Sequence, residues 1–466
     1  MYIQYVGSHM KKIKNLSIFI SFIFLIFFLT GCDISSVEKA FGLDMHGDTA
    51  SDDNGTNTAV EIEYLNDDKS TPKTDSVKTS SLGKNDTDEE ASDDETSPFV
   101  ISDAIYDDVQ KRYSLNAASP DRITISFAGD VCLTEGCSVL NYIKRHDANM
   151  ANSFDEKLLS HMVDSDIFML NNEFPYSAGG APLEGKKYTF RADPASAKYL
   201  NDIGTDIVSL ANNHCYDYGP QALMDTFSTL RDINMPYVGA GENISEASKP
   251  AYFLINGKTI AIIGATQIEG YANPETKEAT ETSPGVLRCL DTTRIKQVIE
   301  EARNNSDFVI CFVHWGTEKS DLIRDWQKST AIDMVDAGAD LIIGAHSHCL
   351  QGIDYIDGVP VFYSLGNYLF NSNTQDTCLI TVSLDCTAAD AVDIDTLRFI
   401  PCIQSGGQTV LASPNDWERI INYEQGISYY ASIDADGYVK RSDKNHNIQN
   451  GKNTSPMREA ENKTEE

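Results

Sequence analysis

The sequence predicts an α/β fold with a second sheet, and three observations support this prediction. Between residues 122 and 360, apolar runs typical of buried strands alternate with segments of helical periodicity, as in strand–helix–strand units. After Val359 the strand-type runs continue without helices between them, which predicts the second sheet. The chain has 466 residues and is 41% hydrophobic, which is enough to bury a core.

The first strand is expected at Ile123–Asp130, because ITISFAGD is β-branched and apolar until it meets a glycine and an acid. Helical spacing predicts a helix over 154–166, which leads into the strand 167–175. The segment 197–204 is expected to be a helix that ends at its glycine, and the strand 206–214 follows.

The alternation continues through the middle of the chain. A helix is expected over 220–233, and the runs at 258–266 and 307–316 read as buried strands. The helix expected over 327–338 ends at a glycine and leads into the strand 340–348. Further strands are expected at 237–238, 360–370, 378–386 and 396–403, and the last two alternate apolar and polar residues as antiparallel strands do.

Residues 1–32 read as a signal peptide that ends in a lipobox. Three lysines at positions 11, 12 and 14 precede an apolar run from Leu16 to Leu29, about 14 residues long, where a spanning helix needs roughly 20. The following LTGC, ending at Cys32, resembles a bacterial lipobox, in which the cysteine is lipidated and becomes the new amino terminus. We therefore expect an extracytoplasmic protein that is lipid-anchored to the bacterial cell membrane through Cys32. A non-lipidated signal peptide and a short membrane anchor stay open as alternatives.

Residues 33–120 are expected to form a disordered acidic spacer. They hold 21 acidic and 7 basic residues, a net charge of −14, with few aromatic residues. Such a segment cannot bury enough apolar surface to offset the entropy that ordering would remove. It would hold a folded domain, expected at 121–410, away from the membrane. Residues 411–466 are expected to be a polar extension that is disordered at its end.

The charge and the cysteines exclude two classes of protein. With 37 Lys and Arg against 70 Asp and Glu, the chain has a formal net charge of −33, which repels phosphate backbones and argues against general nucleic-acid binding. Ten cysteines in a chain of this length are too few for a disulfide scaffold.

Five of the predicted strands end in polar residues that can bind a metal ion. These ends carry Asp130, Glu173, Asn213 with His214, His314, and His346 with His348. Because sites in α/β sheets form at the carboxyl ends of strands, the five ends would converge on one cleft. Each residue alone could be a helix cap, a turn residue or a packed side chain, but the repetition predicts a shared site.

The residue types in these strand ends suit a divalent cation. Carboxylates, imidazoles and an amide oxygen are ligands for Mn, Zn, Fe or Mg, and we expect one or two ions. Two ions about 3.5–4 Å apart can clamp a phosphoryl group and generate hydroxide. His346 and His348 are two positions apart, so beyond a strand end they could divide between two ions.

Six segments, in this order and spacing, resemble the CapA family. They are FAGDVCL, LNNEFP, SLANNHCYDYG, VHWGTE, GAHSHCLQG and YSLGNYLF, and the resemblance covers about residues 122–405. The family is associated with poly-gamma-glutamate capsule synthesis and lies in the calcineurin-like metallophosphoesterase superfamily. The resemblance implies a four-layer αββα sandwich, that is, a β-sandwich flanked by helices, with the metal centre at one edge.

The resemblance also implies roles for the residues in these segments. The metal ligands would be Asp130, Glu173, Asn213, His314, His346 and His348, with Glu173 as the bridge. His214 looks like the catalytic acid that protonates a leaving oxygen. Asn367 looks like a substrate-binding residue of the cleft.

Two departures from the wider superfamily bear on activity. Cys132 stands where a histidine is usual, and Glu173 stands where an aspartate is usual. CapA-like chains share both departures, so they do not argue against membership, but they leave one metal short of a ligand. Phosphatase activity is therefore open, as is a thiolate ligand from Cys132, Cys215 or Cys349.

Three functions follow as alternatives. The first is a cell-surface lipoprotein of the CapA type, involved through a metal centre in synthesis, export or anchoring of poly-gamma-glutamate or a related capsule polymer. Its partners would be the membrane, the polymer and polyglutamate synthase components. The second is an extracellular metal-dependent phosphoesterase, which is a hydrolase. The third is a non-catalytic surface binding protein whose metal is structural.

Overall fold

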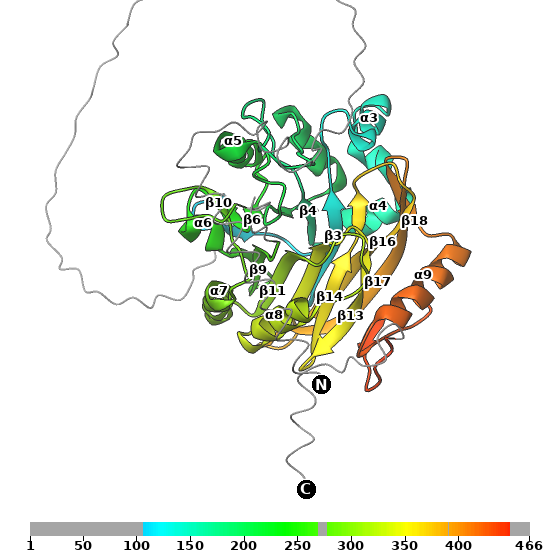
Figure 1. Ribbon diagram of the computed structural model, residues 1–466. Helices are drawn as coiled ribbons and strands as arrows, with labels where there is room; N and C mark the ends of the chain where they lie inside the picture. The colour runs from blue at the N-terminus through cyan, green and yellow to red at the C-terminus, as the bar shows by residue number, and fades with distance from the viewer. Residues whose placement is uncertain (1–105, 269–276, 390, 448–466) are drawn as a thin grey trace, which may run out of the picture. The chain divides into compact units, whose positions relative to one another are not determined.

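The structure is a computed structural model that describes residues 106–268, 277–389 and 391–447. Figure 1 shows two large sheets lying between groups of helices. The predicted signal peptide, Cys32, most of the predicted spacer and the end of the chain lie outside the described residues. Within the described ranges, no helix has the length and apolar character needed to cross a bilayer.

The first sheet, called sheet A here, has eight strands and is parallel in its centre. In sheet order its strands are β1 (Tyr106–Asp107), β2 (Arg112–Ser114), β8 (Ala251–Ile255), β9 (Lys258–Thr266), β11 (Phe308–Trp315), β12 (Leu341–His346), β14 (Val359–Leu365) and β13 (Leu350–Ile356). The run from β9 to β14 is parallel, while β8 and β13 pair antiparallel with their neighbours β9 and β14.

The second sheet, called sheet B here, joins parallel and antiparallel strands. Its order is β18 (Gln408–Leu411), β17 (Asp393–Ser405), β16 (Gln375–Asp385), β3 (Arg122–Val131), β4 (Ile167–Asn172), β5 (Ile207–Ser209) and β6 (Tyr237–Val238), with β15 (Asn367–Leu369) also pairing β3. Two short ribbons complete the strands, β7 (Ala240–Gly241) with β10 (Gly285–Val286) and β19 (Ala431–Ile433) with β20 (Val439–Arg441).

The second sheet predicted from the sequence is present, but its composition is different. The strands after Val359 do not form a sheet of their own, because β14 joins sheet A and β16 to β18 extend sheet B. The antiparallel pairing expected for 378–386 and 396–403 is confirmed by β16 and β17. Strand β16 covers the edge of β3, which would otherwise present unpaired backbone groups.

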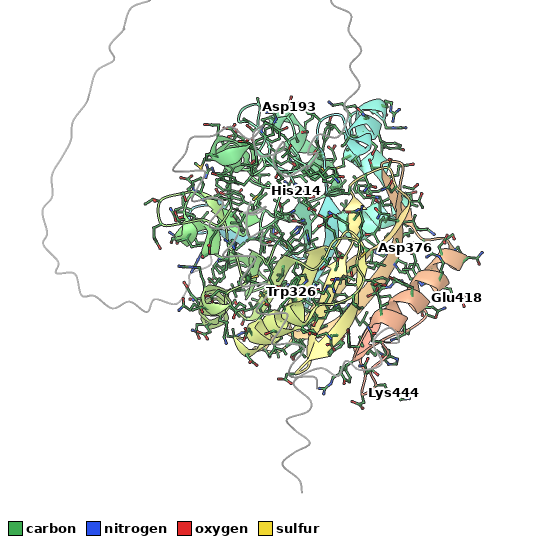
Figure 2. The ribbon with its side chains drawn as sticks, in the orientation of Figure 1. Asp193, His214, Trp326, Asp376, Glu418 and Lys444 are labelled. Carbon is green, nitrogen blue, oxygen red and sulfur yellow. The ribbon has the colours of Figure 1, made fainter. Side chains whose placement is uncertain are left out.

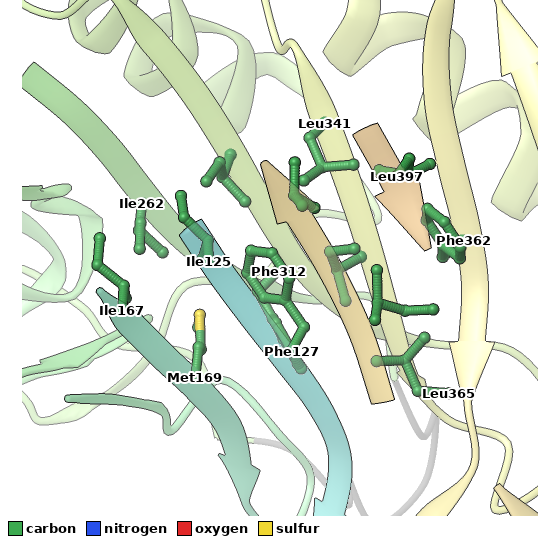
Figure 3. Close-up of a cluster of buried hydrophobic side chains, with 14 of the residues drawn as sticks. Ile125, Phe127, Ile167, Met169, Ile262, Phe312, Leu341, Phe362, Leu365 and Leu397 are labelled. Carbon is green, nitrogen blue, oxygen red and sulfur yellow. The ribbon is translucent and has the colours of Figure 1, made fainter. Parts of the chain in front are cut away.

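The central core lies between the two sheets. Figure 3 shows Ile125, Phe127 and Met169 of sheet B facing Ile262 and Phe312 of sheet A. Strand residues alternate between the two faces of a sheet. In β11 the even positions through Phe312 therefore enter this core, and the odd positions pack against helices.

Helices cover the outer face of each sheet. Those on sheet B are α3 (Ser138–Arg145), η1 (Met150–Ser153), α4 (Glu156–Val163), η2 (Pro194–Ile203) and α5 (Gly219–Asp232). Those on sheet A are α6 (Ile244–Ser248), α7 (Thr293–Asn304) and α8 (Asp325–Asp336). In Figure 1, α7 and α8 lie on one side of the strands and α3 and α5 on the other, so the predicted αββα layering is confirmed.

The helices predicted over 154–166, 220–233 and 327–338 are present as α4, α5 and α8. The helix predicted over 197–204 is a 3-10 helix, η2, and it ends as expected at Gly204, whose φ of +69° is the left-handed conformation that glycine tolerates.

Both predicted boundaries of the folded domain need correction. The spacer was expected to reach residue 120, but β2 lies inside it and pairs with β8. Tyr113 of β2 is buried and packs on Phe253, which explains why this segment is ordered. At the other end, helix α9 (Pro414–Ile427) packs against β13 and β17, so the domain extends past residue 410. The last part of the predicted tail, from residue 448, lies outside the described residues.

Candidate metal centre

The carboxyl ends of β3, β4, β11 and β12 meet at one edge of the two sheets, together with the loop after β5. This confirms that the five strand ends singled out in the sequence converge. They do so across two sheets, since β3, β4 and β5 belong to sheet B and β11 and β12 to sheet A. His214, labelled in Figure 2, lies beside the ends of β3 and β4.

Simple strand alternation places three of the polar side chains. Met169 of β4 faces the core between the sheets, so Asn171 and Glu173, two and four positions later, continue on that face. His314 follows Phe312 of β11 in the same way. All three are fully buried at the end of an otherwise apolar row.

Asp130 reaches the same face through a break in the regular pairing. The register between β3 and β4 shifts between Phe127 and Asp130, and such a bulge redirects the side chains that follow it. Gly129 allows this path, because a Cβ on it would lie 2.0 Å from the carbonyl oxygen of Gly366. The backbone N–H of Asp130 donates to that carbonyl at 3.0 Å.

His346 and His348 both have left-handed backbone conformations. Their φ angles are +95° and +55°, which is uncommon for residues other than glycine. His346 is the last residue of β12, and its N–H donates to Asp130 Oδ2 at 3.2 Å. The strand therefore turns at its end, and this turn brings both imidazoles to the carboxylates of sheet B.

The side chains form two overlapping groups of ligand atoms. One atom each from Glu173, His314 and His346 lie within 4.8 Å of one another, and the same holds for Asp130, Glu173 and His348. Glu173 belongs to both groups, the position expected for a carboxylate that bridges two ions. The cluster could hold one or two metal ions.

The contacts around Glu173 fit a cation better than a hydrogen-bond network. Its Oε1 is buried and has no hydrogen-bond partner among the described residues. Imidazole nitrogens surround that oxygen at 3.6 Å (His314 Nε2), 3.9 Å (His214 Nε2) and 4.0 Å (His348 Nε2). These separations exceed hydrogen bonds, and those from His314 and His348 suit ligand atoms that share an ion, each about 2.0–2.2 Å from it.

Asn213, the remaining predicted ligand, lies beside the first group. Its Oδ1 lies 2.8 Å from His314 Nε2, and His346 Nδ1 lies 3.0 Å from the same nitrogen. The other nitrogen of that ring, His314 Nδ1, lies 3.2 Å from Asn171 Nδ2, which also donates to Asp130 Oδ1 at 2.8 Å. Asn171 thus orients a carboxylate and an imidazole at once, as the supporting residues of metal ligands do.

Burial and neighbouring charge set the protonation of the cluster. Burial, followed by the adjacent imidazoles, holds the pKa values of His314 and His346 well below their ordinary value, so both rings are neutral, as metal binding requires. Burial and the carboxylate of Asp130 raise the pKa of Glu173 well above its ordinary value. For His348 burial alone would lower the pKa, but the contacts with Asp130 and Asn367 and the charge of Glu318 together raise it.

His214 is held from behind by a chain of polar contacts. Its Nδ1 lies 2.7 Å from Asp217 Oδ2, and Asp217 Oδ1 accepts from Lys186 Nζ at 2.6 Å. Lys186 also donates to the backbone carbonyl of Asn213. The ring of Phe190 stacks on the imidazole of His214 at 4.2 Å. Burial lowers the pKa of His214, and Asp217 opposes this in part.

Sequence reasoning missed two residues of this arrangement. Lys186 and Phe190 lie in the long segment between β4 and η2, far from any strand end, so no strand pattern marks them. The sequence marks them in one way: the segment GKKYTF is basic and aromatic, whereas the chain as a whole is acidic. Asp217 was visible in the segment that follows His214.

Asn367 and three of the cysteines lie outside the two ligand groups. Asn367 is buried behind His348, where its Oδ1 lies 2.8 Å from His348 Nδ1 and its Nδ2 donates to Gln375. It therefore orients a histidine and does not line an open cleft. Cys132, Cys215 and Cys349 contribute to neither ligand group in the described part of the chain, and burial raises the pKa of each thiol.

Three side chains at the cluster have some exposed surface. The side chains of Asp130, Glu173 and His314 have no exposed surface, whereas His348 is 13% exposed, Lys186 9% and His214 7%. A substrate would meet these three residues first. Phe190 and Phe370 frame them, because Phe370 packs on His348 at 4.8 Å and the two phenylalanine rings meet edge to face.

Comparison with known proteins gives a family and several curated relatives, two of which are at least 30% identical to this chain. Residues 124–372 match the family described as bacterial capsule synthesis protein PGA_cap. The PGA biosynthesis protein CapA of Bacillus subtilis is 33% identical over 271 residues, which is 57% of this chain and 69% of the relative. The capsule biosynthesis protein CapA of Bacillus anthracis is 30% identical over 314 residues, 64% of this chain and 72% of the relative.

Among solved structures, a 5'-nucleotidase from Candida albicans aligns with a TM-score of 0.35 and 12% identity, over 61% of this chain and 52% of that one.

Proposed function

The chain belongs to the PGA_cap family of bacterial capsule synthesis proteins, and from this membership we propose that it acts at the cell surface in the synthesis, export or anchoring of poly-gamma-glutamate or a related capsule polymer. Its relatives in Bacillus subtilis and Bacillus anthracis bear names that state biosynthesis of this polymer or of a capsule. The partners we propose are the polymer and the components that synthesise it.

The observation that carries the proposal is the pair of ligand groups that share Glu173. The ligands we propose are Asp130, Glu173, Asn213, His314, His346 and His348. A bound divalent ion supplies a Lewis acid and an activated water at neutral pH. The chain's own residues then bind and orient the substrate and move the proton.

His214 is the proposed proton donor. Asp217 occupies its Nδ1 and Phe190 fixes the plane of its ring, so Nε2 is the nitrogen directed at the cluster. Lys186 holds Asp217 in place and puts a positive charge at the entrance to the cluster. Because Asp217 holds the proton of Nδ1, Nε2 would first take a proton from the attacking water and would then pass it to the leaving oxygen or nitrogen.

An anionic polymer needs a local attraction, because the chain has a net charge of −33 and would repel it overall. Lys186 and the bound cation provide that attraction at the accessible side of the cluster. We therefore propose that the polymer contacts the protein at the edge of the sheets and not along its surface as a whole.

The amino-terminal segment supplies the proposed location. The lipobox-like LTGC supports lipidation at Cys32, and the acidic segment after it supports a tether between the membrane and the domain. The protein would then face the polymer outside the cytoplasm.

The test is complementation of a deletion strain of the native host. Wild-type protein is expected to restore surface-bound polymer, whereas the His346→Ala/His348→Ala variant, expressed at the same level, is expected to leave it at the level of the deletion. Surface polymer is measured chemically after washing the cells. Full restoration by the double variant would contradict a role for the cluster.

A second arm of the same experiment tests the anchor. Cys32→Ala is expected to release the protein from the membrane fraction into the medium and to lower surface polymer. Cys132→Ala is the matched control, because that cysteine is buried in the domain, and it is expected to stay with the membrane. Retention of the Cys32→Ala protein in membranes would rule out lipidation as the anchor.

A metal-dependent phosphoesterase is the second candidate, and the contact of His214 with Asp217 beside the ligand groups favours it. Hydrolysis of bis(4-nitrophenyl) phosphate with added Mn²⁺, lost in His214→Gln, would support this activity. If the protein restores surface polymer but does not hydrolyse bis(4-nitrophenyl) phosphate, the capsule role is supported and the phosphoesterase role is not. Tight metal retention with neither effect would indicate a structural metal.

A further inference from the structure

A second cavity lies at the opposite end of the sheet B strands from the metal centre. It has a volume of about 260 Å³ and opens between strand β2 and the loops that lead into β5 and β6. Thr205, Asp206 and Pro236 line it, and they precede these two strands. Because the metal centre follows the carboxyl ends of the same parallel set, the cavity is a separate site.

Three aromatic rings form one wall of this cavity. The ring centroids of Tyr106 and Tyr113 are 5.1 Å apart with planes tilted by 57°, and those of Tyr113 and Phe253 are 5.3 Å apart with a tilt of 35°. Tyr113 and Phe253 are buried at the floor, while Tyr106 is 46% exposed at the mouth. The tilts make a continuous aromatic surface around one side of the space.

Two polar groups on the facing wall have capacity for a ligand. Thr205 is 7% exposed and its Oγ1 has no hydrogen-bond partner among the described residues, although buried hydroxyls normally have one. Asp206 also lines the cavity, and within the described ranges its carboxylate accepts one hydrogen bond, from the N–H of Phe168 to Oδ2 at 2.8 Å.

The only charged side chain among the described residues that line the cavity is acidic. The described residues that line it include a carboxyl group but no lysine, arginine or histidine. Asp166 adds to the negative charge by acting on Asp206, whereas Asp108, which accepts from the hydroxyl of Tyr113 at 3.2 Å, also interacts with the buried Lys111. An anion would be repelled, and an uncharged apolar ligand would leave Asp206 and Thr205 without a partner.

We propose that this cavity binds a small organic ammonium ion. The cation would lie against the faces of Tyr106, Tyr113 and Phe253, where the ring quadrupoles attract positive charge, and opposite the carboxylate of Asp206. A hydroxyl or carbonyl on the same ligand would satisfy Thr205 Oγ1. The cavity volume of about 260 Å³ is large enough for a small organic ammonium ion.

The protonation of Asp206 agrees with this assignment. Burial, followed by the charge of Asp166, raises the pKa of Asp206 to about 7, so the carboxylate lacks a compensating charge. A cation in the cavity would supply that charge and favour the ionised form.

The test is isothermal titration calorimetry of the full chain with choline. Its uncharged isostere, 3,3-dimethyl-1-butanol, has the same shape without the positive charge and serves as the ligand control. Choline is expected to bind at least about tenfold more tightly than the isostere, a factor that corresponds to about 1.4 kcal/mol. Equal affinity for the two compounds, or no binding of choline, would overturn the proposal.

Variants separate this site from the rest of the molecule. Asp206→Asn keeps an oxygen that can accept from Phe168, and it is expected to weaken choline binding at least about tenfold. Asp232→Asn removes an exposed acid outside the cavity and is expected to bind choline as the wild type does. His346→Ala is also expected to bind normally, so failure of the proposed capsule function would leave this result intact. Unchanged binding by Asp206→Asn would overturn the proposal.

Discussion

The same strands have two regions of different chemistry: an amino-terminal half whose inward side chains are apolar, and a carboxyl-terminal end whose inward side chains are polar. In β4, Ile167 and Met169 enter the apolar core, and two and four residues later Asn171 and Glu173 are buried on the same face. In β11, Phe312 lies in the core and His314 follows it. On the core face of each strand, an apolar side chain is therefore followed two residues later by a polar side chain that could bind a metal.

The difference shows how the fold supports a site that is unfavourable by itself. Burial of polar and charged side chains without partners costs several kcal/mol for each group. The apolar half of each strand contributes the burial of apolar area that offsets this cost, at about 25 cal/mol per Å². It also fixes the positions of the ligand atoms, because core side chains pack closely and move little. The proposed cation would therefore contribute to the stability of the polar strand ends and not to that of the apolar core.

The largest effect is expected at the carboxyl halves. The His346→Ala/His348→Ala variant removes one imidazole from each ligand group and is expected to lose its metal almost completely, as measured by elemental analysis after purification without chelator. The matched control is His161→Ala, a histidine of α4 outside both groups, which is expected to keep the wild-type metal content. Full metal retention by the double variant would contradict the ligand assignment.

The next effect is expected in the apolar core between the sheets. Phe312→Ala removes a fully buried ring from the core between the sheets, and the free energy of unfolding is expected to fall by about 3–5 kcal/mol. Denaturant unfolding of the metal-free protein measures this change. Tyr188→Ala, at a ring that is 59% exposed, is expected to change it by less than about 0.5 kcal/mol.

The two halves are separable if the folded Phe312→Ala protein still binds the wild-type amount of metal under native conditions. Loss of metal from a protein that remains folded would mean that the core and the site are more tightly coupled than their separate chemistry suggests.

The smallest effect is expected at the junction of the halves. Gly129→Ala places a Cβ against the carbonyl oxygen of Gly366, directly before Asp130, so the backbone must shift. We expect a loss of about 1–3 kcal/mol in the free energy of unfolding and weaker metal binding in the same variant. Gly179→Ala is the matched control, because its backbone is not left-handed and a Cβ there would meet its nearest atoms at 3.7 Å, an ordinary van der Waals contact. If the Gly129→Ala protein is destabilised but binds metal with normal affinity, the backbone at Gly129 does not connect the stability of the core to metal binding.

Much of the site could be predicted because local patterns mark it. Asn171, Glu173 and His314 lie at the ends of apolar strands, and the period of two that buries Met169 and Phe312 also determines the direction of the polar residues. Lys186 could not be predicted, since it comes from a loop whose path depends on Asp217 and on the backbone carbonyl of Asn213.

The sequence alone determined which residues end the strands, which face most of them take and which metal chemistry they can support, because strand alternation and side-chain chemistry are local properties. Only the tertiary structure decided that the five ends come from two sheets, that a bulge redirects Asp130 and that left-handed turns redirect His346 and His348. The physical reason is that pairing partners, bulges and strained backbone conformations are selected by contacts between segments far apart in the chain, and no local pattern records those contacts.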